Sequence, residues 1–131
     1  MNTILIVEDE LSQRKVIRAE LVHKGFSVLE AKDGIEGLEM ALRLHPDLIL
    51  LDVRMPGMDG MEMMHRLRKD TWGKNASIVI LTNYDNTEDQ LVQMIDDQPS
   101  YFLLKANTPL ETIIDKIEEV LHSHNKPDSI N

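Results

Sequence analysis

The stretch LILLDVRMPGMDG at residues 48–60 decides the fold. Its first four residues are apolar and stand between a Pro-Asp pair and a loop that contains proline and glycine. An apolar run without alternation indicates a strand buried on both faces, as in a parallel sheet. Asp52 closes this strand, and ligands of open parallel α/β sheets bind outside the carboxyl ends of the strands. Asp52 is therefore a candidate for chemistry, and the alternative is an aspartate that caps the turn before Pro56.

Length and composition indicate one globular domain. The chain has 131 residues, 42% of them hydrophobic, and we expect the domain at residues 1–122 and a polar tail at 123–131. Cysteine is absent, which excludes a disulfide framework and a thiolate nucleophile. The apolar run at residues 4–7 is too short for a signal peptide or a membrane-spanning helix, so we expect a cytoplasmic protein without membrane contact. The formal charge of −9 argues against direct binding to nucleic acid.

Strands and helices alternate along the rest of the sequence. The other strands are expected at residues 3–7, 27–31, 77–81 and 101–104. One helix is expected at residues 11–24, where Gly25 ends it. Further helices are expected after the capping residues Asp33, Asp59, Thr87 and Thr108, each followed three residues later by Glu or Gln.

Five strands that alternate with five helices indicate an α/β fold, a doubly wound parallel sheet covered by helices on both faces. The mixed polarity of residues 27–31 suggests an edge strand, and the most apolar strands suggest the middle of the sheet. This pattern is compatible with the flavodoxin-like strand order 2-1-3-4-5. Apolar spacing also assigns sheet-facing residues to the helices: Ile17 and Leu21; Ile35, Leu38 and Leu42; Met63, Met64 and Leu67; and a stripe from Leu110 to Leu121.

Chemically distinct side chains follow four of these strands: Glu8 and Asp9, Asp52, Thr82, and Lys105. In a parallel sheet they converge at one edge, where three carboxylates would repel each other unless a cation neutralised them. Ligands that are all oxygen favour a hard ion such as Mg2+. A hydroxyl and an ammonium beside the ion can bind an anion, most simply a phosphoryl group. A carboxylate can be the nucleophile that receives this group.

These stretches, ILIVEDE at 4–10, LLDVRMPGMDG at 50–60, LT at 81–82 and FLLK at 102–105, closely resemble the receiver domains of bacterial two-component response regulators, including single-domain, CheY-like receivers. The resemblance covers about residues 3–121, and the joint pattern is specific. It implies that Asp52 is the phosphoacceptor in phosphorelay signal transduction. Asp9 and Asp52 would bind Mg2+ directly, Glu8 through water, and Arg54 through its backbone carbonyl.

The resemblance also assigns a switch and partners. Thr82 matches the hydroxyl that follows the phosphoryl group, Lys105 the salt-bridging lysine, and Phe102 the aromatic that changes rotamer. A sensor histidine kinase, a phosphotransferase or a small phosphodonor would supply the phosphoryl group, and water would remove it. The surface presented to a downstream protein would comprise the fourth helix, the fifth strand and the fifth helix.

The sequence departs from the family pattern near that surface. Gln98-Pro99 replaces the usual Gly-Ala, and Asn83 replaces a small residue beside Thr82. Arg54, Asn83 and Tyr84 are expected to modulate the rate of dephosphorylation. Ala106 replaces the proline after the lysine, and because a cis bond before a non-proline residue costs about 2.5–4 kcal/mol, we expect a trans Lys105–Ala106 bond.

Three other functions remain as alternatives. A pseudo-receiver would bind partners without accepting phosphate, although the acids, Thr82 and Lys105 are all present. A Mg2+-dependent phosphatase would need a general acid or base two residues after Asp52, where Arg54 stands, so we expect no enzymatic activity beyond self-phosphorylation and self-dephosphorylation. Flavodoxin-like cofactor binding lacks its Gly-rich phosphate loop.

Overall fold

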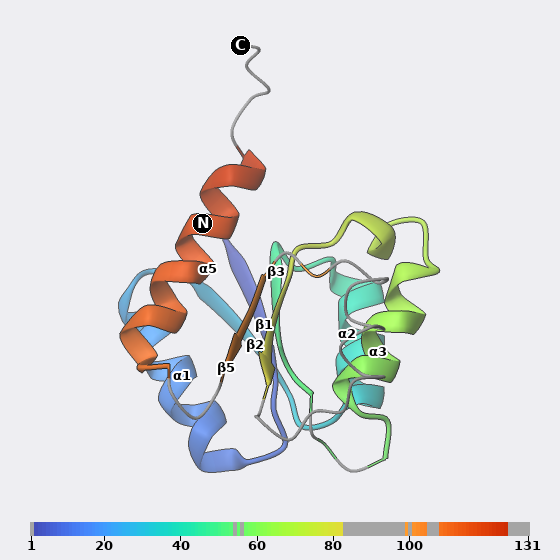
Figure 1. Ribbon diagram of the computed structural model, residues 1–131, viewed down its shortest axis with the longest axis horizontal. Coiled ribbons are helices and arrows are strands. Elements are labelled where there is room, and N and C mark those ends of the chain that lie inside the picture. Colours follow the sequence, from blue (N-terminus) through green and yellow to red (C-terminus); the bar gives the residue numbers. More distant parts are fainter. Residues whose placement is uncertain are drawn as a thin grey trace.

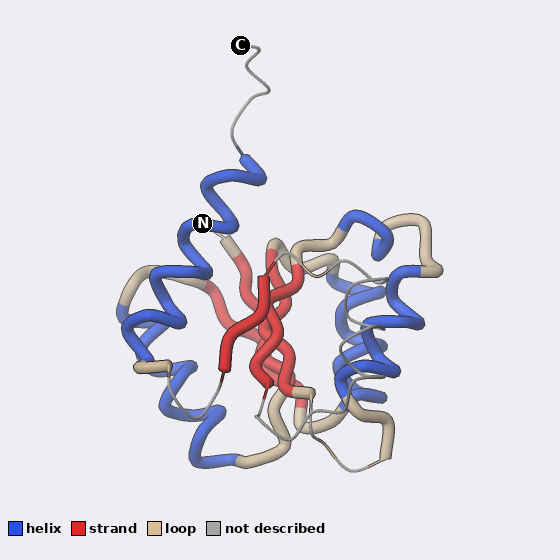
Figure 2. The backbone as a smooth tube through the Cα atoms, viewed as in Figure 1, coloured by secondary structure: helices blue, strands red, loops and turns tan. Residues whose placement is uncertain are grey.

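Five parallel strands form the centre of the protein. The computed structural model describes residues 2–53, 55, 57–82, 99, 101–104 and 108–125. The strands are β1 (Thr3–Val7), β2 (Ser27–Ala31), β3 (Leu48–Asp52), β4 (Ile78–Thr82) and β5 (Tyr101–Leu104). They pair in the order β2-β1-β3-β4-β5, all in parallel (Figures 1 and 2). The predicted sheet and its strand order are therefore confirmed.

Helices cover both faces of the sheet. α1 (Leu11–His23) and α5 (Leu110–Asn125) lie on one face, and α2 (Gly34–Leu44) and α3 (Gly60–Arg68) lie on the other (Figure 1). A short 3-10 helix, η1 (Gly73–Asn75), precedes β4 and was not predicted. The helix expected after Thr87 lies outside the described residues. No helix in the described part of the chain is long and apolar enough to cross a membrane.

The strands divide the core into two layers. In β3, Ile49 and Leu51 pack in the layer under α2 and α3, whereas Leu48 and Leu50 pack in the layer under α1 and α5. This division follows from the two-residue period of a strand. All five residues of β3 are buried, which confirms that this strand is covered on both faces. β2 is exposed or half-buried at four of its five positions, as expected at an edge.

Aspartates begin two of the helices, as the sequence predicts. An Asp33 carboxylate oxygen accepts a hydrogen bond from the Glu36 amide at 2.8 Å, and Asp59 accepts one from the Glu62 amide at 2.9 Å. Each bond satisfies an amide that has no partner within its helix. α5 begins at Leu110, one residue after the expected start at Pro109, and continues to Asn125. The first residues of the expected tail are therefore helical.

The sheet-facing side of α2 differs from the prediction. Ile35 is 64% exposed and Leu42 is 36% exposed, whereas Gly37 and Ala41 are buried against the sheet. A Cβ on Gly37 would lie 2.9 Å from the Val7 methyl carbons, so the helix approaches β1 more closely than a larger residue would permit. Close packing through small residues therefore rotates Ile35 and Leu42 toward solvent, while Leu38 still packs on the core.

Candidate functional site

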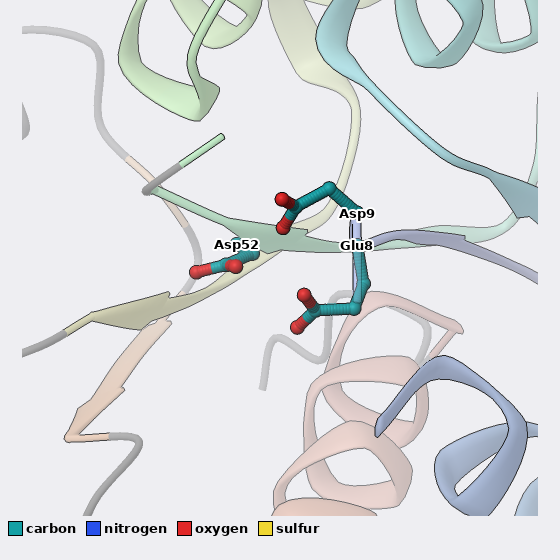
Figure 3. A group of neighbouring side chains, drawn as sticks. All are labelled: Glu8, Asp9 and Asp52. Atoms are coloured by element: carbon teal, nitrogen blue, oxygen red, sulfur yellow. The ribbon is translucent and has the colours of Figure 1, made fainter. Parts of the chain in front are cut away.

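Three carboxylates gather where β1 and β3 end. The register pairs Val7 with Leu51, so the next residues, Glu8 and Asp52, lie side by side. One ligand oxygen from each of Glu8, Asp9 and Asp52 lies within 4.8 Å of the others (Figure 3). Glu8 is 1% exposed and Asp52 is 3% exposed, whereas Asp9 is exposed to solvent. The predicted acid trio is therefore brought together at the carboxyl edge of the sheet.

The backbone around Asp52 is held by β4 and α3. The Val53 amide donates to the Leu81 carbonyl at 3.1 Å, and the Gly60 amide donates to the Val53 carbonyl at 3.0 Å. A Cβ on Gly60 would collide with the Asp52 carbonyl oxygen, so only glycine permits this approach of α3. The cap of α3 is Asp59. Asp52 is therefore not the residue that caps α3, and helix capping does not account for its position.

Hydrogen bonds also hold the turn that carries Glu8 and Asp9. The Glu8 amide donates to the Ala31 carbonyl at 3.1 Å, which extends the pairing of β1 with β2. The Glu10 amide donates to the Glu8 carboxylate at 3.0 Å. The Arg14 guanidinium donates to the Glu8 carbonyl at 2.9 Å. The exposed Asp9 thus lies between two residues whose backbones are fixed.

Arg14 and Glu30 form an ion pair that the sequence did not single out. Arg14 Nε lies 2.9 Å from Glu30 Oε1, and Lys15 and Arg18 lie 3.0 and 3.1 Å from Glu30 Oε2. Burial raises the pKa of Glu30, but hydrogen bonds from Arg14 and Lys15 and the charges of these cations hold that pKa below its ordinary value. The only sequence signal was opposite charge on neighbouring elements, which does not specify a pair.

The acid trio has the composition of a site for a hard divalent cation. Its ligands are all carboxylate oxygens, and two of the three side chains are buried. Buried carboxylates at this separation repel one another, and a cation among them relieves that repulsion. Mg2+ prefers one or two carboxylates and retains several waters, which the exposed side of Asp9 permits. The donor set therefore fits Mg2+.

The other predicted site residues are described in part or not at all. Thr82 ends β4 and is paired with Leu104 of the neighbouring strand β5, whereas Phe102 is paired with Ile80, two residues before the carboxyl end of β4. Their side chains lie outside the described part of the structure. Arg54, Asn83, Tyr84, Lys105 and the Lys105–Ala106 bond also lie outside it.

Comparison with known proteins identifies the family. Residues 4–118 match the family model described as the response regulator receiver domain. The chain belongs to the response regulator receiver family. This receiver is 35% identical over 125 residues to response regulator MprA of Mycobacterium leprae, covering 95% of this chain and 53% of MprA. It is 32% identical over 127 residues to response regulator PleD of Caulobacter vibrioides, covering 88% of this chain and 28% of PleD.

Solved structures agree with this assignment. The receiver superimposes on chemotaxis protein CheY4 of Vibrio cholerae with a TM-score of 0.81 and 28% identity, covering 92% of this chain and 98% of CheY4. The receiver domain of a histidine kinase from Syntrophus aciditrophicus has a TM-score of 0.86 at 24% identity, covering 100% of this chain and 98% of that one, and shows the shared fold. The receiver spans about half the length of MprA and less of PleD.

Proposed function

We propose that this receiver accepts a phosphoryl group on Asp52 in a Mg2+-dependent reaction. The observation that carries the proposal is the convergence of Glu8, Asp9 and Asp52 within 4.8 Å at the carboxyl edge of a parallel sheet. Asp52 is buried, with 3% of its surface exposed, and its carboxylate lies beside those of Glu8 and Asp9 (Figure 3). A carboxylate in this position can attack a phosphorus atom presented from outside the sheet.

The transfer makes one oxygen–phosphorus bond and breaks another bond to phosphorus. An Asp52 carboxylate oxygen attacks the phosphorus of a phosphohistidine, the bond from phosphorus to the imidazole nitrogen breaks, and the bond's electron pair leaves with the imidazole, which then takes a proton. The product is an aspartyl phosphate. Hydrolysis restores the free Asp52 carboxylate: water attacks phosphorus, the carboxylate leaves, and inorganic phosphate forms. Positioning and charge neutralisation are the protein's main contributions to such a transfer.

The chain's own residues would divide the remaining roles. Asp9 and Asp52 would hold Mg2+ directly, with Glu8 acting through water and the Arg54 carbonyl as a further ligand. Bound Mg2+ supplies positive charge that offsets the negative charge on the phosphoryl oxygens. Thr82 and Lys105 would donate to those oxygens, and Arg54, Asn83 and Tyr84 would limit the access of water.

Receivers obtain their phosphoryl groups from histidine kinases or phosphotransferases, and we assign the same class of donor to this chain. Downstream, the phosphorylated form would bind a protein through a surface made of the expected fourth helix, β5 and α5. Family membership supports this signalling role. We propose no turnover of an external substrate for this chain, because receiver domains are in general signalling modules.

The test is covalent labelling followed by intact-mass measurement. Incubation with acetyl phosphate or phosphoramidate and Mg2+ should add the mass of one phosphoryl group, and EDTA should abolish the addition. Asp52→Asn should remain unlabelled. Asp59→Asn is the matched control in the same loop, because asparagine also caps a helix and this variant should label normally. Full labelling of Asp52→Asn would reject Asp52 as the acceptor. No labelling of the wild type would reject the proposal and favour a pseudo-receiver.

A further inference from the structure

Hydrogen bonds hold the peptide groups on both sides of Asp9. The residue is exposed and lies between β1 and α1, in neither a strand nor a helix. On its N-terminal side, the Glu8 carbonyl accepts from Arg14 Nη1 at 2.9 Å. On its C-terminal side, the Glu10 amide donates to Glu8 Oε2 at 3.0 Å. Because peptide groups are planar, fixing both of them restrains the φ and ψ of Asp9 and therefore the direction of its Cα–Cβ bond.

Arg14 can hold the Glu8 carbonyl because its own side chain is held. Its Nε lies 2.9 Å from Glu30 Oε1, and the two side chains are 13% and 20% exposed. The Arg14 amide also donates to the Glu10 carbonyl at 3.0 Å, within the first turn of α1. The planar guanidinium thus makes two bonds at once, one to β2 and one to the turn before α1, which a lysine cannot reproduce.

We infer that Arg14, oriented by Glu30, is a positioning residue that sets Asp9 toward Asp52 for binding of the divalent cation. The inference rests on the proposed Mg2+ site at Glu8, Asp9 and Asp52. Arg14 donates to a backbone carbonyl and not to a carboxylate of the site. Its effect on the cation is therefore through the geometry of the turn.

The direction in which Mg2+ affinity changes when Arg14 is substituted distinguishes a positioning role from an electrostatic one. Arg14 is a cation, so its charge repels Mg2+, and removing that charge would by itself tighten Mg2+ binding. Loss of positioning weakens it instead. Substitution of a group that orients a metal ligand costs 10–100-fold in affinity in typical sites. We therefore expect Arg14→Gln to raise the Mg2+ dissociation constant by about tenfold, against the electrostatic trend.

Two neighbouring cations provide matched controls. Lys15 and Arg18 also pair with Glu30, but they are 54% and 47% exposed, and within the described part of the chain neither forms a hydrogen bond or ion pair with the turn at residues 8–10. Lys15→Gln and Arg18→Gln should leave the dissociation constant unchanged or lower it by about twofold at most, because exposed charges are screened by salt. Arg14→Lys retains the charge and loses the paired geometry, so it should weaken Mg2+ binding like Arg14→Gln. Asp9→Asn is the positive control.

The measurement is a Mg2+ titration of the full chain, followed by the amide shifts of residues 8–10, with thermal unfolding recorded in parallel. Trp72 stacks on His45 with ring centroids 4.3 Å apart, at the opposite edge of the sheet, so its fluorescence reports unfolding separately from Mg2+ binding. Glu30→Gln should also weaken Mg2+ binding, and adding it to Arg14→Gln should cause no further loss, because both act through one contact.

Unchanged or tighter Mg2+ binding in both Arg14 variants would overturn the inference. So would equal weakening in the Arg14 and Arg18 variants, which would indicate a general loss of structure. If an Arg14 variant does not melt cooperatively, Glu30→Gln decides the question, with unchanged affinity as the contrary result. Failure of the proposed function gives a different result: wild-type protein would then take no phosphoryl group even while Mg2+ binding responded to Arg14.

Discussion

Glu30 shows how the surroundings of one carboxylate determine its role. Glu8, Asp9 and Asp52 lie close to one another, whereas Glu30 lies among Arg14, Lys15 and Arg18. The first group gathers negative charge that suits a cation, and the second is already neutralised by the protein's own cations. The second group can therefore stabilise the folded chain without a bound ion.

This difference makes the stability contribution of Glu30 depend on pH. Burial raises the pKa of Glu30, but the hydrogen bonds and charges of Arg14 and Lys15 outweigh burial, so that its pKa in the folded chain is lowered. A group with a lowered folded pKa stabilises the protein above its unfolded pKa, about 4.3, and loses that contribution as the pH falls through the folded value. Glu30→Gln should therefore unfold at lower urea concentration than wild type at pH 7, and the difference should shrink below about pH 4.

An exposed carboxylate provides the comparison. Glu62 pairs with Arg66 at 2.7 Å, but these side chains are 47% and 55% exposed. Exposed pairs four residues apart on a helix contribute little to stability, because solvent and salt screen their charges. Glu62→Gln should consequently change the unfolding midpoint less than Glu30→Gln at pH 7. A Glu30→Gln effect that persists unchanged at low pH would show that shape and not charge is responsible.

At the scale of elements, α2 shows where sequence periodicity is insufficient. The 3.6-residue period predicts this helix and the Asp33–Glu36 pattern predicts its N-terminal cap, and both predictions are confirmed. Periodicity favours the largest apolar residues as the buried side, yet Gly37 and Ala41 contact the sheet. Which side is buried depends on the distance between helix and strand, and that distance is set by residues far apart in the sequence.

In α2, adding one carbon at Gly37 should destabilise the protein more than removing most of the side chain at Ile35. Gly37→Ala adds a carbon 2.9 Å from the Val7 methyls and 3.0 Å from the Met63 sulfur. Overpacking costs about 1–3 kcal/mol, which exceeds the gain of about 1 kcal/mol from alanine's helix propensity. Ile35→Ala, at a position 64% exposed, should change the free energy of unfolding by no more than about 0.5 kcal/mol. Urea unfolding of both variants checks this order, and the reverse order would contradict the packing of α2.

At the candidate site too, the sequence pattern predicts which residues lie together but not the contacts that hold them. The proximity of Glu8, Asp9 and Asp52 could be predicted from the sequence, because Glu8 and Asp9 follow one apolar strand, Asp52 ends another, and parallel strands end at a common edge. The sequence did not indicate Arg14, whose importance arises from the approach of α1 to β2 and from the direction of the Glu8 carbonyl. Residues that hold a site through the backbone have no sequence pattern of their own.

Across the whole molecule, the site lies between two differently packed parts of the sheet. On the β1 side, the Glu8 backbone is bound to β2 and Arg14, and α2 packs on β1 through Gly37. On the other side, Asp52 is paired with Leu81, and Thr82 is paired with Leu104 of the edge strand β5. Movement of the Thr82 hydroxyl toward a phosphoryl group on Asp52 would therefore first change the contacts between β4 and β5.

Phosphorylation should accordingly change the β4–β5 side of the protein more than the β2–α2 side. A phosphoryl dianion on Asp52 offers the Thr82 hydroxyl a charge-assisted hydrogen bond, and the space vacated by the hydroxyl would admit the Phe102 ring. With beryllofluoride as the phosphoryl mimic, amide shifts should change along β4, β5 and α5 and remain nearly constant in β2 and α2. Thr82→Ala should still bind beryllofluoride, with changes confined to residues beside the acids, and Asp52→Asn should show no response. Equal shifts on both sides of the sheet, or an unchanged Phe102 rotamer in the bound form, would place the switch elsewhere, because the β4–β5 pair would then not be the part of the fold that responds to charge at Asp52.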